Sequence, residues 1–140
     1  MDPVVWGPHL WFYMHTLSFN YPENPTNKNK VDHKEFFKNL KETLPCENCR
    51  NHYNKFWDTY KIENYLVSKQ KLIEWVLILH NDVNKRNNKP QWSIDRLKKY
   101  YKKQYSDEPE NYLIAYAKSI KLLLALFLVI ILLLKKYNKI

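Results

Sequence analysis

Cys46 and Cys49 are the residues of this chain best suited to chemistry. They stand in the segment Pro45-Cys46-Glu47-Asn48-Cys49, and residues three apart lie about one turn apart on a helix. This separation lets a redox disulfide form and reopen without movement of the backbone. A helix that begins here would place unpaired amide groups beneath the thiols, which stabilises a thiolate and makes Cys46 a reactive partner. The pair therefore predicts a redox disulfide.

Other interpretations of two cysteines remain open at this point. A zinc site would need two further ligands, and His52 follows at helical spacing with four other histidines elsewhere in the chain. A thioredoxin-like motif requires a strand before the cysteines, whereas no alternating Val/Ile-rich run precedes Cys46. Two incidental cysteines are the third alternative. We favour the redox pair and expect no metal.

Two blocks of aromatic and polar residues flank this pair, and their order adds specificity to it. The first is Trp6-Gly7-Pro8-x-x-Trp11-x-x-x-His15, and the second is Trp75-x-x-x-Leu79-His80-Asn81-Asp82-Val83-Asn84-x-x-x-x-Lys89-Pro90. Taken singly, a Trp on an amphipathic helix is usually a core residue, and a Lys run is usually a solvated face. Taken together, in this order and spacing, the blocks favour a binding site.

The side chains of these blocks are suited to enclose a flat bicyclic or tricyclic ring. Trp11 and His15 lie one turn apart, and His80, Val83 and Asn84 share one face of a second helix. Such faces supply apolar walls with hydrogen-bonding edges. Basic side chains that suit a pyrophosphate follow, namely Lys85, Arg86 and Lys89.

From Trp6 to Trp92 the three blocks resemble the Erv/Alr sulfhydryl oxidases. The resemblance implies an all-α fold, a four-helix bundle with a short fifth helix, which holds FAD at the mouth of the bundle. It implies that FAD is bound by residues of both blocks and the segment after them, namely Gly7, Pro8, Trp11, His15, Trp75, His80, Asn81, Val83, Asn84, Lys85, Lys89 and Trp92.

The resemblance also implies the roles of the two thiols. Cys46 exchanges with the thiols of a protein dithiol substrate, and Cys49 lies next to the flavin. Electrons then pass from the flavin to molecular oxygen, which yields hydrogen peroxide. Members of the family commonly form homodimers through the first helix, where Phe12, Tyr13 and Phe19 would supply apolar contacts.

The sequence departs from cellular members of that family in its cysteines. A shuttle cysteine pair and a structural disulfide after the Lys89-Pro90 block are both missing, and the residues at the latter place are Gln91-Trp92-Ser93-Ile94. Packing must therefore replace the disulfide, and substrate must reach Cys46 directly or through a relay protein. The pattern is similar to the minimal oxidases of large cytoplasmic DNA viruses.

The elements that would position these residues are predicted to be helices. There is a single Gly among 140 residues, which argues against Gly-rich phosphate loops and tight hairpins. Apolar spacing and Pro breaks predict helices over 8–20, from about 31 to 44, from Cys46 onward, over 68–88 and over 93–105, with a loop over 22–30 and Pro8 in the first turn of the first helix.

Beyond Pro109 the composition changes to that of a membrane segment. Residues 122–134 are an unbroken apolar run, followed by Lys135-Lys136. We expect a domain over 1–105, a linker over 106–111, a transmembrane helix over 112–134 and a basic tail over 135–140. A buried core helix is the alternative, but so small a bundle could not surround it. With no signal peptide at the N-terminus, we expect the catalytic domain on the cytosolic side, in the host cytoplasm or at a virion membrane.

A membrane-tethered binding module is the alternative function. From Lys85 to Lys103 eight basic residues stand against one acidic residue, a net charge of +7, interleaved with aromatic side chains. Such a segment could bind nucleic acid or acidic lipid. We favour a solvated helix face near lipid headgroups over a nucleic-acid partner.

Overall fold

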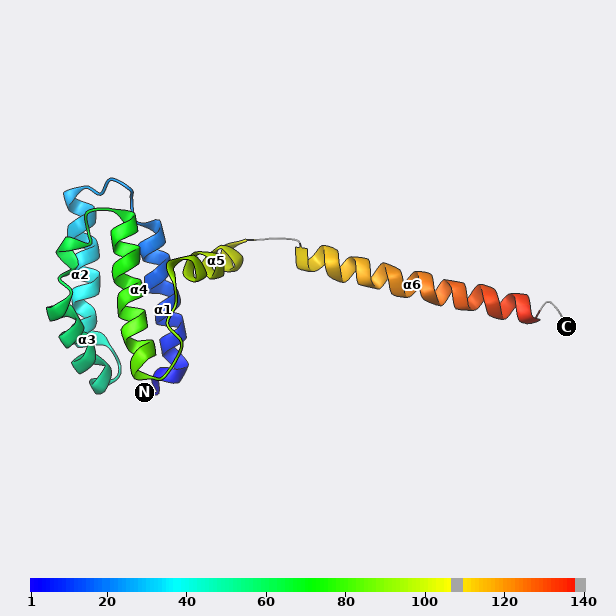
Figure 1. Cartoon of the computed structure of the whole chain (residues 1–140), viewed down its shortest axis with the longest axis horizontal. Helices are drawn as coiled ribbons and strands as arrows, with labels where there is room; N and C mark the ends of the chain where they lie inside the picture. The colour runs from blue at the N-terminus through cyan, green and yellow to red at the C-terminus, as the bar shows by residue number, and fades with distance from the viewer. Residues whose placement is uncertain (107–109, 138–140) are drawn as a thin grey trace. The chain divides into compact units, whose positions relative to one another are not determined.

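Four helices alternate in direction to form a bundle in the computed structural model (Figure 1). They are α1 (Pro3–Asn20), α2 (Asn27–Thr43), α3 (Glu47–Thr59) and α4 (Lys69–Arg86), with a short 3-10 helix η1 (Ile62–Asn64) before α4. Helix α1 packs against α4, and α2 packs against α3. As a result, the start of α1, the end of α2, the start of α3 and the end of α4 lie at one end of the bundle (Figure 1).

Helix α1 begins five residues earlier than the sequence pattern predicted, so Pro8 is not in its first turn. Asp2 caps the helix, because its Oδ1 accepts a 2.8 Å hydrogen bond from the backbone N–H of Val4, and Pro3 occupies the first helical position. Pro8 consequently lies inside the helix, where it leaves the carbonyl four residues earlier without its usual donor. That carbonyl belongs to Val4, which is exposed, so water can replace the lost partner.

Helix α2 also starts earlier than predicted, at Asn27 within the expected loop. Thr26 and Asn29 form a capping box, in which each side chain bonds the other residue's backbone N–H. This reciprocal cap outweighs the polar composition that indicated a loop. The third helix has Cys46 as its N-cap and Glu47 as its first residue, one residue later than expected.

The core of the bundle is centred on Trp75. Its ring is fully buried and makes edge-on contacts with Phe37, Phe56 and Trp57, at ring-centroid distances of 5.1, 5.3 and 6.0 Å. The indole N–H donates a 2.9 Å hydrogen bond to the carbonyl of Tyr60, so burial leaves no unsatisfied donor. Trp75 thus holds α4 against α2 and α3.

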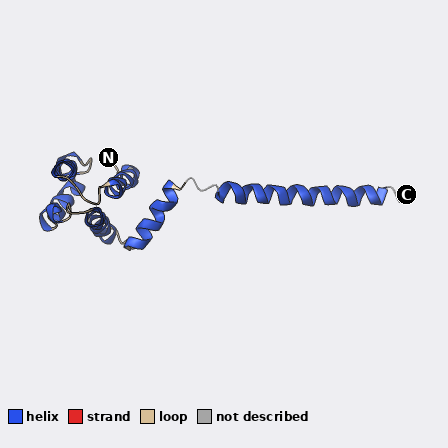
Figure 2. Ribbon diagram, turned by 90° about the horizontal axis from the view of Figure 1, so that it is seen from above, coloured by secondary structure: helices blue, strands red, loops and turns tan. Residues whose placement is uncertain are grey.

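The structure describes residues 1–106 and 110–137, and within them the regular structure is helical, with no strand (Figure 2). The chain divides into two units, Met1–Leu97 and Lys98–Ile140. Helix α5 (Ile94–Tyr105) crosses from the first unit into the second, and α6 (Glu110–Tyr137) belongs to the second. The predicted linker and basic tail lie partly outside the described residues.

Helix α6 contains a segment long and apolar enough to cross a membrane. Tyr116–Lys135 covers 20 residues with a mean hydropathy of 2.5, and none of it is buried in the protein. By length and composition, this is the apolar segment that the sequence predicted.

Candidate functional site

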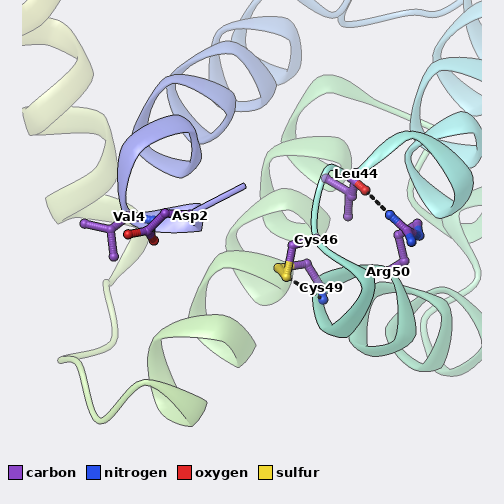
Figure 3. The surroundings of a disulfide bond; sticks show 6 residues. All are labelled: Asp2, Val4, Leu44, Cys46, Cys49 and Arg50. Atoms are coloured by element: carbon purple, nitrogen blue, oxygen red, sulfur yellow. Dashed lines mark hydrogen bonds between the residues drawn. A yellow bond between two sulfur atoms is a disulfide. The ribbon is translucent and has the colours of Figure 1, made fainter.

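Cys46 and Cys49 form a disulfide at the start of α3, with their Cα atoms 5.1 Å apart (Figure 3). Cys46 is the N-cap, and its Sγ accepts a 3.2 Å hydrogen bond from the backbone N–H of Cys49. This bond directs the amide end of the helix at sulfur, which suits a thiolate at Cys46 once the disulfide opens. Both cysteines are half-buried, so the pair is open to solvent while Cys49 also packs against the core.

Two histidines that are 65 residues apart in the sequence form the centre of a second cluster. Nε2 of His15 on α1 lies 3.0 Å from Nδ1 of His80 on α4. The indole of Trp11 stacks on the His80 ring at 4.2 Å with an interplanar angle of 10°. The contact between α1 and α4 therefore brings together three of the predicted site residues.

Burial keeps this histidine pair uncharged near neutral pH. Burial, reinforced by the neighbouring His80, lowers the pKa of His15 to about 3. Burial and the positive charge of Lys89 lower the pKa of His80 to about 4. Two neutral imidazoles can donate and accept hydrogen bonds without carrying a charge into the site.

Asn81 draws the segment after α4 back onto the bundle. Its Nδ2 donates a 2.8 Å hydrogen bond to the carbonyl of Trp92, and its Oδ1 accepts a 2.7 Å bond from the backbone N–H of Trp92. The chain can turn here because Asn88 adopts a left-handed conformation with φ of 52°, which Asn tolerates better than most residues. The Trp92 ring consequently lies 5.6 Å from the ring of His80.

Asn84 provides a buried amide one turn beyond His80. It is 7% exposed, and its Nδ2 has no hydrogen-bond partner among the residues that the structure describes. A buried donor without a partner is costly, which makes this amide suited to an acceptor on a ligand. Val83 beside it is half-buried.

The remaining predicted site residues have more varied environments. Lys85, Lys89 and Pro8 are exposed, and Gly7 is half-buried. A Cβ added to Gly7 would meet nothing within 4 Å, so the chain itself leaves space at this position. Trp75, in contrast, is enclosed by core aromatic residues rather than joined to the cluster of Trp11, His80 and Trp92.

Sequence reasoning missed two residues that shape the site. Arg50 reaches back across the cysteine segment to the carbonyl of Leu44, and Asn88 makes the turn that returns Trp92. Arg50 could have been found as a basic residue one turn after a helix start at Pro-Cys. Asn88 could have been found from the pair Asn87-Asn88, which stands before Lys89-Pro90. Within the described residues, no three His, Cys, Asp or Glu side chains gather as a metal site requires.

Comparison with known families gives one match that covers most of the bundle and α5. The model of the Erv1 / Alr family matches residues 8–106. A probable FAD-linked sulfhydryl oxidase of Acanthamoeba polyphaga mimivirus is 34% identical over 60% of this chain and 59% of its own length. The FAD-linked sulfhydryl oxidase of an African swine fever virus isolate is 32% identical over 69% of this chain and 79% of its own length.

Solved structures show the same fold. The yeast Erv1 core matches with a TM-score of 0.66 and 25% identity, over 77% of this chain and 86% of that structure. The FAD binding domain of Erv1 from Saccharomyces cerevisiae also matches with a TM-score of 0.66, at 26% identity over 76% of this chain and 96% of that structure. The chain spans about half the length of a fission yeast mitochondrial relative, 49% of it, at 32% identity.

Proposed function

The chain belongs to the Erv1/Alr family, and we propose that it is an FAD-dependent thiol oxidase that forms disulfides in protein substrates. The observation that carries this proposal is the Cys46–Cys49 disulfide at the N-terminus of α3. A helix N-terminus is where a thiolate is stabilised and where cysteine pairs exchange disulfides with substrates. The viral and cellular relatives named FAD-linked sulfhydryl oxidases support the same activity.

The residues of the histidine cluster fit FAD. The unpartnered amide of Asn84 suits a ring carbonyl, and the stacked pair of Trp11 and His80 shows that aromatic faces meet here. Bound FAD would accept two electrons from the reduced cysteines and pass them to molecular oxygen, giving hydrogen peroxide. Trp75, which the resemblance also implied, is fully buried in the core and would support the site from behind rather than contact FAD. The residues proposed to hold FAD are Gly7, Pro8, Trp11, His15, His80, Asn81, Val83, Asn84, Lys85, Lys89 and Trp92.

The two cysteines have different parts in the exchange with substrate. A substrate thiolate attacks Sγ of Cys46, a substrate–Cys46 bond forms, the Cys46–Cys49 bond breaks, and Cys49 leaves as a thiolate. A second substrate thiol then displaces Cys46, so the substrate loses two electrons and two protons as its own disulfide forms. This assignment suits the site because the helix end stabilises Cys46 as the thiolate that leaves in the second displacement, whereas Cys49 packs against the core.

The substrates are protein dithiols, presented directly or by a thiol relay protein. The printed sequence holds two cysteines, so no shuttle pair within it stands between substrate and Cys46. We also propose a homodimer through α1, where Phe12 and Tyr13 are exposed. The apolar rings on that helix would supply the contact.

Helix α6 is proposed to be a single-pass membrane anchor. Its 20-residue apolar segment covers about 30 Å at 1.5 Å per residue, which matches the hydrocarbon core of a bilayer. Tyr116 and Tyr137 are exposed near its two ends, where interfacial tyrosines are typical. The catalytic domain would remain on the cytosolic side, in the host cytoplasm or at a virion membrane, in keeping with the viral relatives.

The test is the visible absorption spectrum of the purified full chain, followed by oxygen uptake on addition of dithiothreitol. We expect a flavin spectrum and dithiol-driven oxygen consumption that Cys49→Ser abolishes. Asn48→Ser is the matched control, because it changes the same turn and keeps both thiols, and it should remain active. A protein that is colourless and inactive after incubation with FAD would contradict the proposal and leave the basic segment from Lys85 to Lys103 as the functional feature.

A further inference from the structure

Arg50 forms a clamp across the segment that carries Cys46 (Figure 3). Its guanidinium Nη1 donates a 2.6 Å hydrogen bond to the backbone carbonyl of Leu44. Its backbone N–H donates a 3.0 Å bond to the carbonyl of Cys46. The two bonds enclose Leu44, Pro45 and Cys46, the whole connection between α2 and the first residue of α3.

The clamp has a physical reason to be stable. Leu44 is the C-cap of α2, and the last carbonyls of a helix have no intrahelical donor. A cation is favoured at this negative end of the helix dipole. Arg50 is half-buried and Leu44 is buried, so water competes less for this bond than at an open surface.

The same short segment carries a second restraint, the Cys46–Cys49 disulfide. Once one restraint is in place, less conformational entropy is lost when the other forms. Each restraint therefore makes formation of the other more favourable. Neither of the two Arg50 bonds involves a sulfur atom, so opening the disulfide does not itself break them. If both bonds persist, they would limit how far Cys46 moves from the head of α3 in the reduced protein.

We propose that Arg50 is a positioning residue for the redox pair, which sets how readily the Cys46–Cys49 disulfide is reduced; this inference rests on the proposed redox function of that pair. Reduction of the disulfide takes up two electrons and two protons, breaks the S–S bond and leaves two thiols. Without the clamp the reduced segment gains conformational freedom, which favours the open form. Loss of Arg50 thus raises the reduction potential of the couple.

The experiment is a redox titration of the full chain in detergent with dithiothreitol buffers, in which free thiols are counted by alkylation and mass spectrometry. We expect Arg50→Gln to shift the equilibrium toward the thiols about tenfold, which is about 30 mV for a two-electron couple. Arg50→Lys keeps the charge and an ammonium group that can donate to the Leu44 carbonyl, and should recover part of the shift. Lys41→Gln is the matched control, because Lys41 is the basic residue in the last turn of α2. It removes a charge from the same helix end and should leave the potential unchanged.

Thermal unfolding of the oxidised and reduced forms separates positioning from a general structural role. A structural role would lower both unfolding midpoints equally and leave the potential unchanged, and that result would overturn the proposal. An equal shift from Lys41→Gln would also overturn it, because charge alone would then explain the effect. If dithiothreitol cannot reduce the wild-type disulfide, the redox function itself is overturned. If the wild-type disulfide is reduced but Arg50→Gln has the same reduction potential, only the role of Arg50 is overturned.

Discussion

Nε2 of His15 and Nδ1 of His80 lie 3.0 Å apart and join α1 to α4 through side chains that are 65 residues apart. A hydrogen bond at this distance requires one ring to donate and the other to accept, so one of the two facing nitrogens carries a proton and the other does not. The pair is enclosed, since His15 is fully buried and His80 is stacked on Trp11. This contact connects the two sequence blocks that flank the cysteine pair.

The bundle should lose stability as the pH falls from about 6.5 to 4. The folded pKa values of His15 and His80 are about 3 and about 4, below their ordinary value of 6.5. The unfolded chain therefore binds more protons in this window, which lowers the free energy of unfolding by up to roughly 3 kcal/mol for His80. Urea denaturation followed by Trp fluorescence measures the free energy of unfolding at each pH, because all five Trp residues lie within the bundle and the adjoining segment. His80→Gln should flatten the pH dependence and His9→Gln, at an exposed position, should not; a stability independent of pH would contradict a buried neutral pair.

Gly7→Ala should stabilise the protein but weaken FAD binding. Gly7 lies within α1, and replacing a helical Gly by Ala gains roughly 0.5–1 kcal/mol. The added methyl would meet nothing of the chain within 4 Å, so it costs nothing unless a ligand uses that space. Titration with FAD and thermal unfolding measure the two effects. Asn39→Ala on α2 is the control that raises helix propensity away from the site, and an FAD affinity unchanged by Gly7→Ala would remove Gly7 from the cofactor site.

Asn81→Ala should release Trp92 from the bundle. Both hydrogen bonds between Asn81 and the Trp92 backbone are lost, at a cost of about 1–3 kcal/mol in the free energy of unfolding. Asn81→Asp keeps the acceptor for the Trp92 N–H and should lose less. Asp82→Asn is the neighbouring control, since it breaks the surface ion pair with Arg86, which is worth about 1 kcal/mol or less. FAD affinity measured on the same variants should fall with Asn81→Ala, and an unchanged affinity would show that Trp92 does not contribute to the site.

Truncation after Glu108 should give a chain that no longer floats with phosphatidylcholine vesicles yet keeps its flavin. The deleted region contains the apolar segment Tyr116–Lys135, none of which is buried in the protein. Leu126→Arg in the full chain should weaken insertion by roughly 3 kcal/mol, whereas Leu126→Ile should leave it intact. Flotation and the flavin spectrum are the two measurements. Loss of flavin on truncation would mean that α6 contributes to the folded domain.

The helices of the bundle could be predicted from spacing, but their first residues could not be fixed by it. The apolar residues of α4 recur at helical intervals, and the helix was predicted to begin at about Ser68, which is its N-cap. The starts of α1 and α2 depended on Asp2 and on the pairing of Thr26 with Asn29, because a side chain that satisfies free amides decides where a helix begins. Composition alone indicated a loop at the start of α2.

The sequence by itself determined the all-helical class, the cysteine pair at a helix start, the apolar C-terminal segment and the resemblance that points to FAD. These features depend on which residues are present and on their spacing within one helical turn or one continuous apolar segment. Both can be read directly from the order of residues in the chain. Tertiary structure alone decided that His15 meets His80, that Trp75 lies in the core and that Arg50 bonds the carbonyl of Leu44. Periodicity says which face of a helix is apolar, but which side chains meet across two helices depends on how those faces pack, and that requires the whole fold.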